Sequence, residues 1–484
     1  MNKKTLALVI AAVFLTTLLF SCAELGFNTD PSLSLVEKPG GESGSSSVKY
    51  TDLTAEEWLA NLEDDNFGGY TFTIATSKPY RFYPEEEMTG MVNPALEKRN
   101  ALVAEKYNVV IKEVYYEESS LQAALSDAVL AGKQFSDLVS VSMPVMSTLA
   151  AAGRLLNLFS LPFFDVTAEY LNTSAIKNSA IGDYLYAIYD QASFYEEDFW
   201  CVFYNESLLP QKAGEDITKA VRDGTWSWDM LLSYAETAAK DVMDKRSPDL
   251  RKDIFGIGSY ASSADLYSAL FASSGNFLFG DTFHKKAAYS LAAGTGDAVA
   301  AKIKEVVKNK SYLSLSGEEA SSAFLDGRTA FFVYRVGFAN AVAATNLVWG
   351  ISPLPKVLEG QEKYFSYVGP TSAGISVPVH QSNSARTGKV LNALCAASYL
   401  NIEEALKTNY ITFCLRDNDS AITLSEIFKN PAINVGTIYS EGYERVSLLT
   451  RETISEAITA GDSFNYLYMT NASALKSLNE TDFK

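Results

Sequence analysis

Short apolar runs alternate with segments of helical periodicity over the first third of the chain. Three runs rich in β-branched and aromatic residues predict strands, and between them apolar residues recur at helical spacing. One helix opens near Asn93-Pro94, and another is capped by Ser120 and stopped by Gly132. This alternation predicts an α/β fold with a parallel sheet covered by helices on both faces. The predicted strands are Tyr70–Thr76, Val109–Tyr115 and Asp137–Ser142.

A ligand site is predicted at the carboxyl ends of these strands, because open α/β sheets bind ligands there. Two segments qualify: residues 77–83 and residues 142–144. Neither is glycine-rich, so a phosphate-cradling loop is not indicated. They offer hydroxyls, charges and aromatic faces instead, and the candidates for ligand binding are Ser77, Tyr83, Ser142 and Met143.

The chain opens with a signature of export. Lys3 and Lys4 precede an apolar stretch, Leu6–Phe20, that is too short for an ordinary membrane span. The sequence Leu-Phe-Ser-Cys that ends at Cys22 resembles a bacterial lipobox, which implies a signal peptide over residues 1–21 and acylation of Cys22. The alternative is a simple secretory signal cleaved near Ser21. The expected location is the extracellular face of the cytoplasmic membrane, with a lipid anchor.

Residues 22–65 are expected to form a flexible tether. Their middle part is rich in glycine and serine and poor in large apolar residues, so it cannot bury enough surface to offset its ordering entropy. The remaining body of about 420 residues is long enough to split into at least two domains.

Composition narrows the range of functions. The formal charge is −18, and loss of residues 1–21 removes two lysines and no acid, which gives −20. Such a charge disfavours nucleic acid as a partner. With only two histidines, zinc catalysis and histidine triads are nearly excluded, and no metal or cofactor is expected. Cys201, Cys395 and Cys414 sit in apolar contexts and are expected to be buried thiols, although a bridge between the last two stays open.

An ordered set of motifs over most of the body resembles the extracellular solute-binding proteins of carbohydrate ABC importers, the maltose-binding-protein-like family. That family implies a two-lobe, type II clamshell that binds a sugar reversibly as a monomer and delivers it to permease subunits. The motifs are Gly90–Val109, Leu149–Leu158, Phe203–Leu209, Thr225–Asp229, Gly327–Phe331 and Gly350–Pro355.

The resemblance also implies where the chain divides. The first lobe is expected to comprise residues 66–191 and 328–368, and the second residues 193–326 and 369–484. The first crossing between lobes would be Tyr189–Asp198, just before a buried strand.

Further candidates for ligand contact lie at this crossing and after a later strand. Tyr195, Glu196 and Asp198 could present polar groups to sugar hydroxyls, and Asp198 matches a position where related sugar binders place a ligand-contacting acid. Tyr334 and Arg335 follow the predicted strand Thr329–Val333. The alternatives are a solvated acidic turn at the crossing and an arginine paired with a nearby acid. Two tryptophans, Trp226 and Trp228, are expected to be core residues beside a helix start.

Two alternatives to reversible sugar binding are compatible with the sequence to different degrees. A surface carbohydrate-active enzyme would need two carboxylates about 5–10 Å apart across a glycosidic bond, and no second acid facing Asp198 is evident. The same fold could instead bind a peptide or another small solute. The sequence therefore favours a binding protein that is not an enzyme.

The lipid anchor is directly testable. Metabolic labelling with a fatty-acid analogue should mark the wild-type protein, and Cys22→Ala should abolish the label because no acylated thiol can form. A label that persists in the variant would contradict the anchor.

Overall fold

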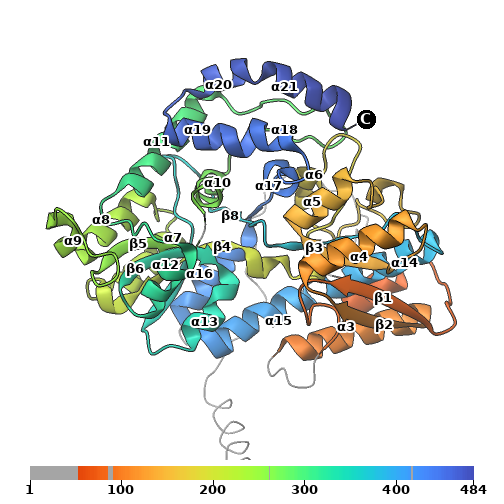
Figure 1. The fold of residues 1–484 in the computed structure, drawn as a ribbon. Helices are drawn as coiled ribbons and strands as arrows, with labels where there is room; N and C mark the ends of the chain where they lie inside the picture. The colour runs from red at the N-terminus through yellow and green to blue at the C-terminus, as the bar shows by residue number, and fades with distance from the viewer. Residues whose placement is uncertain (1–52, 85–90, 261, 416–417, 484) are drawn as a thin grey trace, which may run out of the picture. The chain divides into compact units, whose positions relative to one another are not determined.

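The computed structural model describes residues 53–84, 91–260, 262–415 and 418–483. Within these ranges the chain forms two four-stranded sheets with helices around them (Figure 1). The predicted signal peptide, Cys22 and most of the predicted tether lie outside the described residues. No helix among the described residues is long and apolar enough to cross a bilayer.

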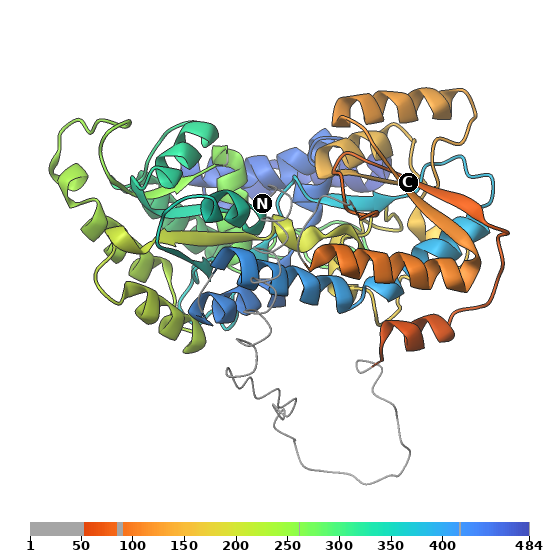
Figure 2. The same ribbon diagram turned by 90° about the horizontal axis from the view of Figure 1, so that it is seen from below.

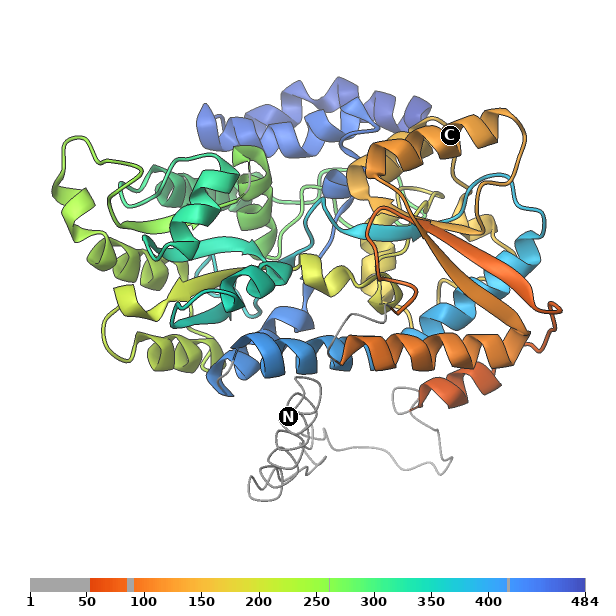
Figure 3. The same ribbon diagram turned by 60° about the horizontal axis from the view of Figure 1, so that its bottom comes forward.

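The first sheet has the order β2-β1-β3-β9 and defines the first lobe. Strands β1, β2 and β3 are parallel, as predicted, and β9 runs antiparallel to β3. Helix α4 begins at Glu118, so Ser120 lies inside the helix and is not its cap. Figure 3 shows α4 and α5 on one side of the sheet and α3 with α14 on the other. The bounds are β1 Tyr70–Thr76, α3 Val92–Tyr107, β2 Val109–Tyr115, α4 Glu118–Leu130, β3 Leu138–Ser142, α5 Met143–Ala151, β9 Ala373–Ser376 and α14 Ser384–Ser398.

The second sheet has the order β5-β6-β4-β7 and defines the second lobe. Strand β4 is antiparallel to β6 and β7, and β5 is parallel to β6. The second lobe also contains helices α7, α8, α10, α11 and α12. The bounds are β4 Trp200–Asn205, α7 Ala213–Arg222, α8 Trp228–Ala238, β5 Phe255–Ser259, α10 Ser263–Ser273, α11 Ala293–Lys308, α12 Gly317–Leu325, β6 Thr329–Arg335 and β7 Trp349–Pro353.

These pairings correct the predicted lobe boundaries. Residues 328–368 were assigned to the first lobe, but β6 and β7 pair with β4 in the second. Residues 369–484 were assigned to the second lobe, but β9 pairs with β3 in the first. The reason is that β6 is buried along Thr329–Val333 and needs strand neighbours on both edges, which β5 and β4 supply.

Two crossings between the lobes run side by side. The first passes through the short helices η3 (Gln191–Ser193) and η4 (Tyr195–Asp198). The second returns after β8 (Ser366–Tyr367): Phe199 forms an isolated antiparallel bridge with Val368, and the Gly369 amide donates to the Asp198 carbonyl over 3.3 Å. The chain passes between the lobes again through α15 (Asn401–Tyr410), which packs on α3, and α16 (Asn418–Lys429), which packs on β7.

The last helices join the two lobes as a separate layer, seen along the top in Figures 1 and 3 and behind the sheets in Figure 2. The Ser147 hydroxyl on α5 donates to the Tyr439 carbonyl over 2.9 Å, and the Tyr439 hydroxyl donates to the Ser179 carbonyl over 2.9 Å. Helix α19 packs on α10 and α11 of the second lobe. This layer comprises α17 Val435–Tyr439, α18 Glu444–Ser447, α19 Thr453–Thr459, α20 Phe464–Thr470 and α21 Ala472–Ser477.

The predicted tether ends earlier than expected. Residues 55–60 form helix α2, whose start carries a capping box between Thr54 and Glu57. Trp58 is 6% exposed and packs edge-on against Tyr170 at 5.2 Å between ring centroids. The prediction of a tether up to residue 65 was therefore wrong at this end, because Trp58 and its neighbours bury enough apolar surface to order the segment.

The predictions that the tryptophans and cysteines are buried are confirmed. Trp226 and Trp228 are buried, and the Trp226 indole donates to the Pro353 carbonyl over 3.0 Å. The Ser227 hydroxyl accepts from the Met230 amide and caps α8, so the two tryptophans lie beside a helix start, as expected. The prediction of buried thiols is confirmed, and the possible bridge is absent, since the three described cysteines are free and buried: Cys201, Cys395 and Cys414.

The close approach of the two crossings predicts that a methyl group added at Gly369 destabilises the fold. A Cβ at Gly369 would lie 2.5 Å from Nε1 of Trp200, whose indole is itself buried. We expect Gly369→Ala to lower the free energy of unfolding by about 1–3 kcal/mol through overpacking. The matched control is Gly294→Ala in α11, where nothing lies within 4 Å of the added atom. Equal urea midpoints for the two variants would contradict the close approach.

Candidate solute-binding site

Polar ends of both sheets converge on one carboxylate, Asp198, which lies immediately before β4. Lys78, after β1, places Nζ 3.1 Å from Oδ2 of Asp198. Arg335, at the end of β6, places Nη1 3.0 Å from Oδ1. The Thr371 hydroxyl, just before β9, donates to Oδ1 over 2.8 Å. Asp198 therefore connects the first lobe, the second lobe and both crossings.

This carboxylate is charged despite its burial. The Asp198 side chain is 2% exposed, and desolvation by itself would raise its pKa. Lys78, Arg335 and Arg81 outweigh that effect and hold the pKa of Asp198 below its ordinary value. The predicted alternative of a solvated acidic turn is therefore wrong for Asp198. The other alternative, an arginine paired with an acid, describes Arg335 in this conformation.

A second ion pair and a pocket adjoin Asp198. Arg81 pairs with Glu197, and its guanidinium lies over the Phe194 ring at 5.2 Å from the centroid. Both residues of the pair line a pocket of about 280 Å³ whose other walls come from the β1–α3 loop, the start of α3, the crossing and the second lobe. These walls are Pro79, Tyr80, Val92, Asn93, Phe194, Asn340 and Asn409. Amides, a guanidinium and a ring are groups that suit a small polyhydroxyl solute.

Ser77 and Ser142, both predicted as ligand contacts, are brought together by Glu118. The Ser77 hydroxyl donates to Oε1 of Glu118 over 3.2 Å, and the Ser142 amide donates to the same atom over 2.9 Å. Glu118 is the first residue of α4, and nothing in the local sequence marked it as part of this arrangement. The two predicted strand ends therefore lie side by side, as the fold rule required.

Tyr334 and Arg335 lie at the carboxyl end of β6, where they were expected. The half-buried Tyr334 ring packs on Tyr260, which follows β5, with 4.7 Å between centroids and 31° between planes. The Arg335 guanidinium lies 5.7 Å from the Tyr334 centroid. These neighbours form an aromatic surface next to the Asp198 cluster.

None of the nine predicted ligand contacts is among the residues that line the pocket of about 280 Å³, and Tyr83, Met143 and Tyr195 are engaged elsewhere. The Tyr83 side chain is 53% exposed, and Glu113 accepts from its backbone amide over 2.9 Å. Met143 is fully buried in the core. Tyr195 is 5% exposed, and its hydroxyl accepts from the Asn172 amide over 3.0 Å. In this conformation the Met143 and Tyr195 side chains are buried and cannot contact a solute directly.

Glu196 is a buried acid whose carboxylate has no hydrogen-bond partner among the described residues. It is 1% exposed. Burial, and then the nearby Glu403 and Asp190, raise the pKa of Glu196 well above its ordinary value. This environment disfavours a negative charge on Glu196.

Several members of this site were missed by sequence reasoning. Lys78 and Arg81 fall within the segment 77–83, which the strand rule had singled out without choosing them. Asn340 follows the predicted strand that ends near Arg335. Thr371 carried no local signal, because its position depends on the second crossing.

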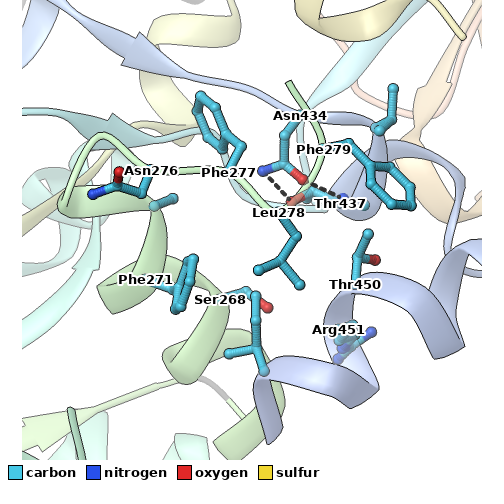
Figure 4. A pocket seen from close by; sticks show the side chains of 14 residues that line it. Ser268, Phe271, Asn276, Phe277, Leu278, Phe279, Asn434, Thr437, Thr450 and Arg451 are labelled. Atoms are coloured by element: carbon cyan, nitrogen blue, oxygen red, sulfur yellow. Dashed lines mark hydrogen bonds between the residues drawn. The ribbon is translucent and has the colours of Figure 1, made fainter. Parts of the chain in front are cut away.

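Another pocket lies between α10 and α17, shown in Figure 4. Its free volume is about 30 Å³, which holds only one or two water molecules. Arg451, on one wall, is bonded to Asp265 over 2.7 Å, and the Asn434 side chain accepts from the Thr437 amide over 3.0 Å. This pocket cannot hold a sugar ring in the present conformation.

The fold is that of a two-lobe α/β binding protein. The chain is similar to the GacH receptor of Streptomyces glaucescens, with 16% identity, coverage of 85% of this chain and 99% of that chain, and a TM-score of 0.50. It is also similar to a cyclo/maltodextrin-binding protein, with 14% identity, coverage of 85% and 97%, and a TM-score of 0.50. These similarities confirm the predicted fold. No curated protein sequence matches the chain.

Residues 100–421 match the family described as bacterial extracellular solute-binding protein, and the chain belongs to that family. The match spans more than half of the chain. It confirms the prediction of an extracellular solute-binding protein, and with it the prediction that the chain binds its solute and is not an enzyme.

The buried charge of Asp198 predicts a pH-dependent stability. Asp198→Asn should lower the free energy of unfolding by about 3–5 kcal/mol at pH 7, because two cations lose their buried partner. Since the folded pKa is depressed, this stabilisation is fully present above the unfolded pKa of about 4 and is lost as pH falls through the folded pKa. Urea unfolding should therefore show a constant difference between pH 7 and 5 that shrinks in stronger acid.

The matched control is Asp223→Asn, since Asp223 pairs with Lys219 in an exposed helix pair. It should change stability by less than about 1 kcal/mol. A difference between wild type and Asp198→Asn that is small, or that grows on acidification, would contradict the buried ionised state.

Proposed function

We propose that this protein captures a saccharide outside a bacterial cell and delivers it to the permease of an ABC importer, as a monomer anchored through acylated Cys22. The observation that carries the proposal is the cluster around Asp198. It brings side chains of both lobes and both crossings together beside a polar pocket of about 280 Å³. The ligands bound in the two similar structures, acarbose and maltotetraose, agree with this class of solute.

The wall chemistry supports a saccharide. Sugar hydroxyls both donate and accept, and the amides of Asn93, Asn340 and Asn409 also offer both roles. The paired rings of Tyr260 and Tyr334 offer a surface for the apolar face of a sugar. A volume near 280 Å³ lies at the lower end for ligand pockets, so the pocket as it stands suits one or two sugar rings.

These contacts can account for the free energy of binding that a micromolar affinity requires. A micromolar Kd corresponds to about −8 kcal/mol. Hydrogen bonds to charged groups contribute roughly 1.5–3 kcal/mol each, so a few of them with one ring contact suffice.

Binding should be coupled to lobe closure. Arg81 comes from the first lobe and Asn340 from the second, and both line the pocket. A solute that contacts both lobes binds the closed state more tightly and shifts the equilibrium toward it. The enclosed solute would then reach the permease as part of one compact surface.

The proposal is tested by a thermal-shift screen against mono- and oligosaccharides, followed by small-angle scattering. A ligand at about 100 times its Kd should add roughly 2.7 kcal/mol to stability. The same ligand should reduce the radius of gyration, and its chain length and linkages should be unchanged after incubation. Tight binding without compaction would exclude the closing mechanism, and stabilisation by peptides in place of sugars would exclude the saccharide.

A further inference from the structure

The Asp198 cluster carries more positive than negative charge. Three cations, Lys78, Arg81 and Arg335, face two acids, Glu197 and Asp198. The cations are poorly hydrated: their side chains are 22%, 13% and 32% exposed in that order. A surplus cation held in such a place is costly unless an anion compensates it.

Neighbouring acids do not pair with the three cations. Burial raises the pKa of Glu196 well above its ordinary value and so disfavours its ionised form. Glu118 accepts from Ser77 and Ser142, and Glu113 accepts from backbone amides, including that of Phe82 over 2.7 Å. Among the described residues, the ion pairs of Lys78, Arg81 and Arg335 are with Glu197 and Asp198.

Acids on the elements packed behind the crossing are likewise committed elsewhere. Glu403 on α15 pairs with Lys407, and Asp190 caps η3 through the Ala192 amide.

The cations themselves show the effect of the surplus. Burial, Arg81 and Arg335 all lower the pKa of Lys78, and Asp198 does not fully offset them. The positive potential at Nζ is therefore not cancelled by the protein's own acids.

Two buried donors beside the cluster have no acceptor among the described residues. They are Nε of Arg335 and the hydroxyl of Tyr410, and the charges of Glu197 and Arg81 act on this hydroxyl. Unsatisfied buried donors cost about 1–3 kcal/mol each. Their position next to the surplus charge marks the place where an acceptor-rich anion would complete the bonding.

We propose that the solute is an acidic saccharide, a uronate or uronate oligomer, whose carboxylate binds at Lys78, Arg81 and Arg335. This rests on the proposed function. The pocket that Arg81 lines also carries three side-chain amides and the Phe194 ring, so a sugar ring that bears a carboxylate contacts more of the site than a small inorganic anion would. The acidic surface does not prevent this, because at physiological salt its field is screened beyond about 8 Å.

The test compares matched ligands on the full-length protein by isothermal titration calorimetry. Galacturonate and digalacturonate are compared with galactose and galactobiose, which lack only the carboxylates, and with the methyl ester of galacturonate. We expect the acids to bind at least tenfold more tightly than the neutral sugars and the ester. Higher salt should weaken the acids more than the neutral sugars.

Each alternative outcome has a distinct meaning. Neutral sugars that bind as well as the acids would overturn the acidic-saccharide proposal and leave the proposed function standing. Failure of every saccharide would overturn both. Acetate that binds as tightly as galacturonate would show an anion site without sugar recognition, and would also overturn the proposal.

Variants locate the carboxylate. Arg335→Gln and Lys78→Gln should each weaken galacturonate by about tenfold to a hundredfold, with a smaller effect on galactose. The control is Lys219→Gln, an exposed lysine of a surface pair, which should change neither affinity. Thermal melting without ligand shows whether each variant is folded. A folded Arg335→Gln that keeps the wild-type preference for the acid would overturn the assignment of this cluster.

Discussion

The ionised carboxylate of Asp198 is the constraint around which the site is organised. It is buried, so it must be compensated by opposite charge and hydrogen bonds, and the compensation comes from elements far apart in the sequence. Lys78 ends the first strand of one sheet, Arg335 ends a strand of the other, and Thr371 belongs to the returning crossing. One charge thereby connects three chain segments that lie far apart in the sequence.

This arrangement separates two tasks between neighbouring acids. Asp198 holds cations in place, Glu197 pairs with Arg81 at the pocket wall, and Glu196 is buried with its pKa raised well above the ordinary value. Three consecutive acidic residues in one short helix thus experience three different environments. Their sequence identity alone gives no sign of this division, because the difference lies in what each side chain meets across the crossing.

The hydrophobic pattern of the sequence predicted individual strands well, but it did not predict which distant strands pair. The strands over Tyr70–Thr76 and Val109–Tyr115 have the bounds expected from periodicity and breaker residues. The assignment of β6 to a lobe failed because strand pairing depends on burial across the whole second sheet. For the site, Asp198 was singled out by the family resemblance and its place at the predicted crossing, and Arg335 because it follows a predicted strand. Thr371 and Glu118 were missed because only the folded chain brings them near.

The bonds made by Tyr439 restrict the way in which the lobes can move. Its carbonyl and hydroxyl both bond to the first lobe, while α19, a few residues later, packs on the second. If both attachments persist during opening, the strain falls on the short run between α17 and α19, which includes the π-helical turn at Leu448–Glu452. That run would have to change its backbone geometry if the lobes moved apart while both contacts were kept. A segment remote from the solute would then take part in opening and closing.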